Sequence, residues 1–177
     1  MRLFIAILLS HEVRQSLVEL QCYLQGRHPE LHDIRWTVAE NLHITLKFLG
    51  DAPKTDLPRL TEALQPCVQT AAFTLQPDKV ALLPPRVLAV HLSGDLTAAA
   101  DLAARIDVAC RELGFPSESR PYLPHIMLAR LRGRFSGFAS ERFESPSLPV
   151  NSFSLMQSRL DAAGARYACL ARYPFCS

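Results

Sequence analysis

The sequence predicts an α+β protein with two pseudo-twofold-related lobes, each an antiparallel sheet with covering helices, arranged around a central cleft. Its 177 residues are the length of one domain, so residues 1–177 are expected to form a single folded unit. Segments with strand periodicity alternate with segments of helix periodicity from end to end. The order of these segments repeats along the chain, and this repeat is the reason for expecting two lobes.

The repeat is weak residue by residue but consistent in the order of its elements. Two pairs of short segments match at an offset of 80 positions: Phe73-Thr74-Leu75 with Phe153-Ser154-Leu155, and Arg86-Val87-Leu88-Ala89 with Arg166-Tyr167-Ala168-Cys169. The strand-then-helix unit 2–26 likewise resembles 86–114, and each of these units leads to a strand that contains a histidine.

The first elements follow directly from the apolar pattern. Leu3 to Leu9 are consecutive apolar residues and predict a buried strand. Ser10 suits an N-cap, and a helix is expected to run from there to Gly26. Its apolar residues repeat at helical spacing: Val13, Leu17, Leu20 and Leu24. A short strand at 35–38 comes next.

Residues 42–49 alternate with period two and predict a strand with one buried face. Leu42, Ile44, Leu46 and Phe48 are expected to face the core. His43, Thr45, Lys47 and Leu49 share the other face, so three polar side chains stand in a row there.

The remaining elements are predicted by the same two periodicities and by turn residues. Helices are expected at 57–68 and 96–113, the latter ending at Gly114. Strands are expected at 73–80, 86–92, 122–131, 152–160 and 166–174, with residues 132–149 as a surface excursion and a turn at 161–164.

Composition excludes several classes of protein. Apolar residues at 49% and charged residues at 20% are ordinary for a folded globular protein, and no apolar run approaches the roughly 20 residues that span a membrane. A net charge of +2 is too small for a general nucleic-acid coat. The five cysteines are odd in number and form no C-x-x-C pair, which argues against a disulfide framework and against a zinc site. We therefore expect a cytoplasmic monomer without a metal or cofactor.

Two strands with a histidine in a matching context are the informative feature. They read Asn41-Leu42-His43-Ile44-Thr45-Leu46 and Leu123-Pro124-His125-Ile126-Met127-Leu128, nearly one repeat apart. A single histidine in an apolar strand is usually a packing residue. Two histidines at equivalent places in two lobes are instead expected to face each other across the cleft, where imidazoles can exchange protons near neutral pH.

The pattern resembles the two-histidine (2H) phosphoesterase superfamily, whose members carry two H-x-T-x motifs. More narrowly it is similar to the RNA 2′,3′-cyclic phosphodiesterase family, once described as 2′-5′ RNA ligases. The matching stretches span essentially the whole chain: Arg2–Ala6, Arg35–Thr37, Asn41–Gly50, Pro124–Arg130 and the Arg166-Tyr167 hairpin. The resemblance implies a bilobal fold with a central cleft and metal-independent opening of a cyclic phosphate.

Carried over by residue, the resemblance makes His43 the general acid toward the departing 3′ oxygen and His125 the general base on water. The product it implies is a 2′-phosphomonoester, with weak reverse ligation to 2′-5′ linkages as a second activity. Thr45 is expected to donate a hydrogen bond to a phosphate oxygen.

One position departs from the family pattern. Met127 stands where the second motif normally has a hydroxyl residue, and a thioether donates no hydrogen bond. Arg130 matches the family's arginine after this motif, but strict alternation places it on the face away from His125, so it is either a phosphate contact or a surface cation. Lys47 has the parity to add positive charge to the cleft, with a solvated strand-end lysine as the alternative.

Three aromatic residues, Trp36, Phe48 and Tyr122, are candidates for base stacking, with core or rim packing as the alternative. The expected partner is RNA with a 2′,3′-cyclic phosphate end. Two alternatives stay open: a cyclic phosphodiesterase acting on small nucleotides, and a non-catalytic protein that binds RNA ends or nucleotides. A metal hydrolase is disfavoured because neither histidine has a second ligand at a recognised spacing.

Overall fold

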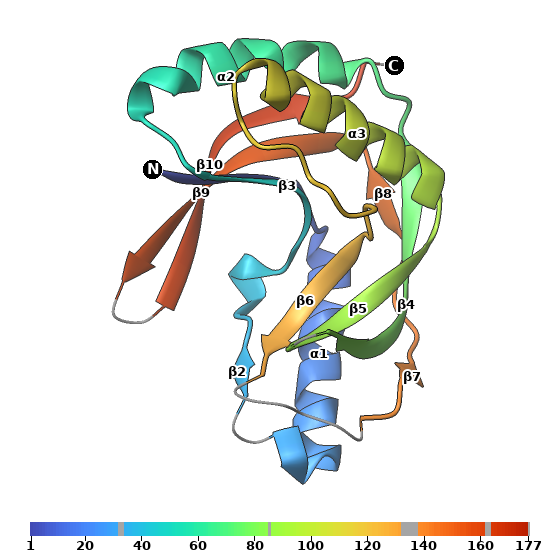
Figure 1. The fold of residues 1–177 in the computed structure, drawn as a ribbon. Helices are drawn as coiled ribbons and strands as arrows, with labels where there is room; N and C mark the ends of the chain where they lie inside the picture. Colours follow the sequence, from blue (N-terminus) through green and yellow to red (C-terminus); the bar gives the residue numbers. More distant parts are fainter. Residues whose placement is uncertain (32–33, 85, 132–137, 162–163, 177) are drawn as a thin grey trace.

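The computed structural model describes residues 1–31, 34–84, 86–131, 138–161 and 164–176, and in these residues ten strands form one sheet (Figure 1). The strands are β1 (Arg2–Leu8), β2 (Arg35–Trp36), β3 (His43–Asp51), β4 (Phe73–Leu83), β5 (Val87–Gly94), β6 (His125–Arg130), β7 (Glu141–Arg142), β8 (Leu148–Val150), β9 (Ser152–Asp161) and β10 (Gly164–Pro174). Helices α1 (His11–Arg27), α2 (Leu57–Ala63) and α3 (Leu96–Glu112) cover it. The predicted α+β class is confirmed.

The sheet order is symmetric about its centre. It runs β10-β9-β1-β3-β6-β5-β4-β7, with β2 added to β6 and β8 to β4, and the strand pairs that join it are antiparallel. Strand β1 beside β3 mirrors β5 beside β6, as the resemblance of 2–26 to 86–114 predicts. The division of the chain into two lobes stays a prediction.

One of the two short sequence matches does not follow this symmetry. Phe73–Leu75 and Phe153–Leu155 lie on β4 and β9, which occupy mirror positions in the order. Arg86–Ala89 lies at β5, whereas Arg166–Cys169 lies on β10, outside β9. This second match is therefore wrong, because the two segments occupy different places in the sheet.

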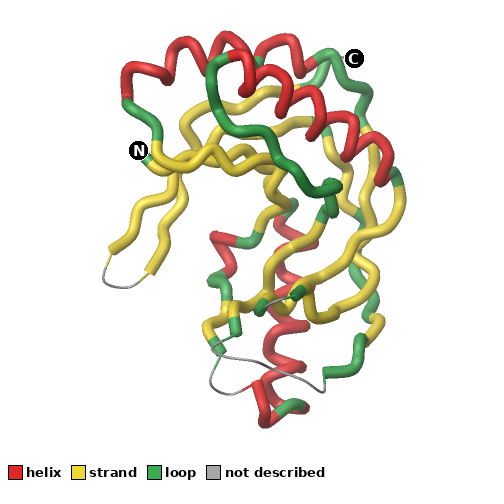
Figure 2. Tube along the Cα trace, viewed as in Figure 1, coloured by secondary structure: helices red, strands yellow, loops and turns green. Residues whose placement is uncertain are grey.

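The two long helices lie on different parts of the sheet (Figures 1 and 2). Helix α1 runs behind β6, and the buried Gln21 side chain donates from Nε2 to the Leu128 carbonyl of β6 at 3.1 Å and to the Thr37 carbonyl at 2.9 Å. Helix α3 lies against β3, where Asp107 accepts from Lys47. Each long helix thus contacts the histidine strand that belongs to the other half of the chain.

The helix boundaries follow local chemistry. Ser10 caps α1, its hydroxyl accepting from the Val13 N–H at 3.3 Å, as predicted. The helix continues through Gly26 to Arg27, one residue beyond its predicted end. Residues 57–68 form α2 followed by a 3₁₀ turn at Gln65–Val68, since Pro66 supplies no N–H to continue an α-helix. None of the described helices is long and apolar enough to cross a membrane.

Two of the predicted strands are shorter than expected, a third is shifted along the chain, and one predicted loop contains strands. The expected strand 122–131 begins only at His125, just after Pro124, and the expected strand 35–38 pairs only at Arg35–Trp36. The expected strand 42–49 begins one residue later, at His43, and continues two residues further, to Asp51. The described part of the 132–149 excursion contains β7 and β8, both paired with β4, while residues 132–137 lie outside the described residues.

We expect Gln21→Leu to lower the free energy of unfolding by about 1–3 kcal/mol, because the Thr37 carbonyl and one lone pair of the Leu128 carbonyl lose their buried donor. Urea unfolding monitored by circular dichroism measures this. Gln15→Leu on the same helix is the control, since Gln15 is exposed and bonds only to Glu19, and its effect should stay within about 0.5 kcal/mol. Equal losses in the two variants would contradict this role for Gln21.

Candidate active site

The two histidines come from the strands at the centre of the sheet. β3 and β6 share one register pair, Ile44 with Ile126, and both isoleucines are fully buried. In an antiparallel pair the residues on either side of this contact share the opposite face. His43, Thr45, His125 and Met127 therefore face one way, and all four line a cavity of about 450 Å³, called the histidine cavity below.

Both imidazoles are oriented by the same local contact. His43 Nδ1 lies 2.7 Å from the Asn41 carbonyl oxygen, and His125 Nδ1 lies 2.8 Å from the Leu123 carbonyl oxygen. Because a carbonyl only accepts, the proton of each neutral ring is on Nδ1 and Nε2 is left to exchange a proton. His43 Nε2 lies 3.0 Å from Thr45 Oγ1, so this hydroxyl meets the nitrogen that would exchange a proton.

His43 sits in aromatic surroundings that change its titration. The rings of Phe4 and Tyr167 lie 5.0 and 5.3 Å from its ring, centroid to centroid. Burial lowers the pKa of His43 below its ordinary value of 6.5, the hydrogen bond to Asn41 raises it by less, and the charge of His125 lowers it further. In the free protein His43 is therefore biased toward the neutral form.

A β-bulge decides which other side chains of β3 reach the cavity. Between the register pairs Ala6–Thr45 and Ile5–Lys47 the strand has one extra residue, Leu46, which reverses the alternation beyond it. Phe48 was expected in the core and is instead 68% exposed and lines the cavity, while Leu49, expected on the polar face, is buried. Those two predictions are wrong because the sequence pattern does not reveal the bulge.

Lys47 is displaced by the same bulge. Instead of facing the cleft it is buried on the side of α3, where its ammonium donates to Asp107 and to the Pro116 carbonyl. Neither a cleft cation nor a solvated lysine describes it, so both alternatives for Lys47 are wrong.

A second bulge at the equivalent place settles the position of Arg130. β6 has an extra residue, Leu128, between its register pairs Ala89–Met127 and Leu88–Ala129. The reversal turns Arg130 to the face of His125, and Arg130 lines the histidine cavity. Phe48 and Arg130 thus each lie five residues after a histidine.

The sequence did not single out several residues of the cavity wall. Phe4 comes from an apolar run in which no period-two signal is visible. Asn41 both orients His43 and donates from Nδ2 to the Ala165 carbonyl at 2.6 Å, which ties β10 to the cavity. His91 does not line the cavity but is the register partner of His125, and burial, then Lys79 and His125, lower its pKa.

The charge of the cavity suits an anion. Arg2 and Arg130 are among its described lining residues, and none of these is Asp or Glu. No group of three His, Cys, Asp or Glu side chains that could hold a metal occurs among the residues that the structure describes. Trp36 and Tyr122, two of the aromatic candidates, pack against the core, and Tyr122 donates to the Thr45 carbonyl at 3.1 Å.

Known proteins are similar to this chain in both sequence and fold. The sequence profile of LigT-like phosphoesterases matches residues 7–89. The RNA 2′,3′-cyclic phosphodiesterase of Thermus thermophilus is 30% identical over 98% of this chain and 89% of its own length. The RNA 2′,3′-cyclic phosphodiesterase of Geobacillus stearothermophilus is 29% identical over 97% of this chain, which spans only 56% of that protein.

Among solved structures, E. coli LigT complexed with 3′-AMP superimposes with a TM-score of 0.86 at 26% identity, covering 99% of this chain and 98% of that one. The sequence and the fold therefore indicate the same family. The chain belongs to the LigT-like phosphoesterase family, within the two-histidine phosphoesterase superfamily.

Proposed function

We propose that the protein opens RNA 2′,3′-cyclic phosphate ends to 2′-phosphomonoesters, without a metal, by acid–base catalysis. The observation that supports this most strongly is the pair of imidazoles on one cavity wall, each fixed through Nδ1 by a backbone carbonyl so that Nε2 is left to exchange a proton. Binding an anion would require positive charge, but it would not require two titratable rings held in the same way.

In the proposed reaction the phosphorus lies between the two rings. His125 Nε2 takes a proton from water as the water oxygen bonds to phosphorus, and protonated His43 gives its Nε2 proton to the 3′ oxygen as the P–O3′ bond breaks. The 2′ oxygen keeps the phosphate, and solvent returns the proton from His125 to His43. An RNA 5′-hydroxyl in place of water would give a 2′-5′ linkage by the same steps.

Other lining residues have roles that match their chemistry. The Thr45 hydroxyl donates to a non-bridging oxygen as negative charge develops there, and the Arg130 guanidinium compensates that charge. Phe48, exposed at the cavity, offers an apolar ring face to a base. Met127 lies beside His125 and supplies contact area but no donor.

The test is incubation with a 2′,3′-cyclic mononucleotide and with an oligonucleotide ending in a 2′,3′-cyclic phosphate, both with chelator, followed by identification of the product isomer. We expect a 2′-phosphate, and His43→Ala and His125→Ala should each lower the rate at least about a hundredfold. A 3′-phosphate product, or near wild-type turnover in either variant, would refute the assignment. Turnover of the mononucleotide alone would point to a small-nucleotide substrate.

The pH dependence follows from the protonation states that the roles require. His125 must be neutral, so kcat/KM falls at low pH. His43 must be charged, so kcat/KM is expected to fall again at high pH, and because burial lowers the pKa of His43, its charged form is less populated in the free protein near neutral pH. In kcat, which reports the substrate complex, the phosphate anion favours charged His43 and should move the alkaline limb upward. A kcat/KM that climbs steadily from pH 5 to pH 8 would contradict these roles.

Met127 makes the two motifs unequal, so phosphate stabilisation should depend more on Thr45. A hydrogen bond to a charged group contributes roughly 1.5–3 kcal/mol, about ten- to a hundredfold in rate. Thr45→Ala should lower kcat/KM by that factor, Met127→Ala by less, and Met127→Thr should raise it. If Met127→Thr loses activity and Met127→Ala loses as much as Thr45→Ala, then methionine is an adapted part of the site and phosphate stabilisation does not depend mainly on Thr45.

A further inference from the structure

The two histidine strands barely pair with each other. β3 and β6 meet at the single register pair Ile44–Ile126, whereas β3 pairs with β1 at seven positions. A single register pair does little to fix the angle between two strands. The relative placement of His43 and His125 must therefore depend on contacts outside the sheet.

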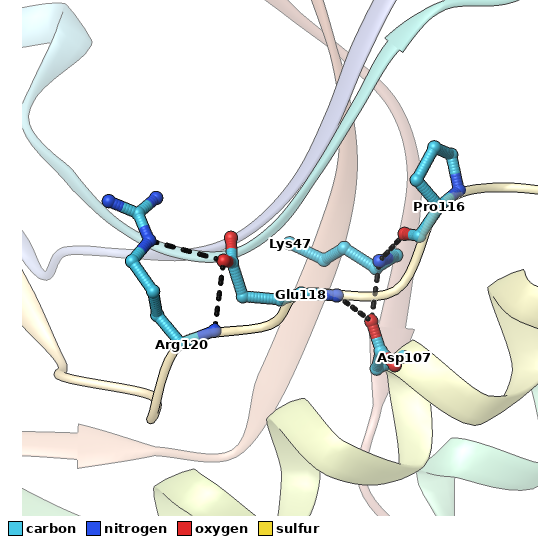
Figure 3. Close-up of polar contacts among 5 residues, drawn as sticks. All are labelled: Lys47, Asp107, Pro116, Glu118 and Arg120. Atoms are coloured by element: carbon cyan, nitrogen blue, oxygen red, sulfur yellow. Dashed lines mark hydrogen bonds and ion pairs between the residues drawn. The ribbon is translucent and has the colours of Figure 1, made fainter.

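Lys47 is at the centre of such contacts (Figure 3). Its side chain is 4% exposed, and its ammonium donates to Asp107 Oδ1 of α3 at 2.5 Å and to the Pro116 carbonyl at 2.7 Å. The same Asp107 oxygen accepts from the backbone N–H of Glu118 at 3.1 Å. One side chain of β3 is thereby joined to α3 and, at two points, to the segment that follows it.

That segment, residues 115–124, leads directly into β6 and sets the orientation of His125. Its Leu123 carbonyl accepts from His125 Nδ1, and its Tyr122 hydroxyl donates to the Thr45 carbonyl at 3.1 Å. The segment is thus attached to β3 at two places, by Lys47 near its start and by Thr45 near its end. Both attachments lie within four residues of His43.

The packing of the core does not explain why Lys47 and Asp107 form an ion pair here. A buried pair loses hydration, and replacing both partners by apolar residues is often neutral or stabilising. Burial by itself would raise the pKa of Asp107, but hydrogen bonds from Lys47 and the Glu118 N–H hold that pKa below its ordinary value. An apolar pair could fill the same space, but it could not bind the Pro116 carbonyl or the Glu118 N–H.

We propose that Lys47, acting with Asp107, is a positioning residue that ties segment 115–124 to β3 and so fixes the His125 imidazole relative to His43. The proposal rests on the proposed function for its effect on rate, but the geometry it describes can be measured without a substrate. Lys47 itself does not line the histidine cavity, so its charge acts on the segment and not directly on the phosphate.

The test compares Lys47→Met with the double variant Lys47→Met/Asp107→Leu. The single variant leaves the partly buried Asp107 without its cation and should be destabilised; the double variant should regain most of that stability. Because the segment still lacks its attachment through Lys47, kcat in the double variant should stay about ten- to a hundredfold below wild type, with KM within about threefold. Lys47→Arg, which keeps the donors, should recover part of kcat.

Arg120→Ala is the matched control. Arg120 forms an ion pair with Glu118 in the same segment, but it is 84% exposed and does not contact Lys47 (Figure 3). Its kcat should stay within about twofold of wild type. If the double variant recovers kcat together with stability, Lys47 is merely structural and the proposal is overturned.

A second readout separates this proposal from the proposed function. In the double variant the imidazole ¹⁵N resonances of His125 should change, because its Leu123 contact moves, while those of His43 should keep their wild-type shifts. If the wild type fails to open cyclic phosphates but the His125 resonances change, the function is wrong and the positioning role stands. Unchanged His125 resonances in the double variant would overturn the positioning role by themselves.

Discussion

A β-bulge three residues after each histidine controls what the cavity contains. Leu46 in β3 and Leu128 in β6 are each the extra residue of such a bulge, and each reverses the side-chain alternation directly beyond it. Without the bulges, Phe48 and Arg130 would point into the core and Lys47 would point into the cavity. The chemistry available to a bound phosphate therefore depends on these two irregularities as much as on the histidines.

The bulges also place the basic side chains of the site in different surroundings. Lys47 is buried against α3 and its charge is balanced by Asp107, whereas Arg130 and Arg2 remain in a cavity whose described lining has no carboxylate. The imidazoles can then differ in environment although their backbone contacts match. His43 is enclosed by Phe4 and Tyr167, and burial lowers its pKa, whereas phosphate binding would favour its charged form. Such a difference between two equivalent groups is what an acid–base pair needs.

The sequence predicted much of the fold and of the candidate site, and the remaining features could not be predicted from it for physical reasons. The apolar periodicity predicted the helices and strands, and the matching contexts of His43 and His125 placed both on one face. A bulge adds one residue without changing composition, so the positions of Phe48, Leu49 and Lys47 could not be read from strict alternation. Phe4 lies in a uniformly apolar run, and His91 becomes a neighbour of His125 only through the register of β5 with β6. Only pairing between strands reveals such contacts.

The proposed mechanism depends on His43 as the acid and His125 as the base, and the most direct test uses a substrate whose leaving group needs no acid. A 2′,3′-cyclic phosphate whose 3′ oxygen is replaced by sulfur has a thiolate leaving group, which departs without protonation. On this substrate His43→Ala should turn over within about tenfold of wild type, while His125→Ala should remain slow, because water must still be activated. If His43→Ala is as impaired with sulfur as with oxygen, His43 is not the general acid.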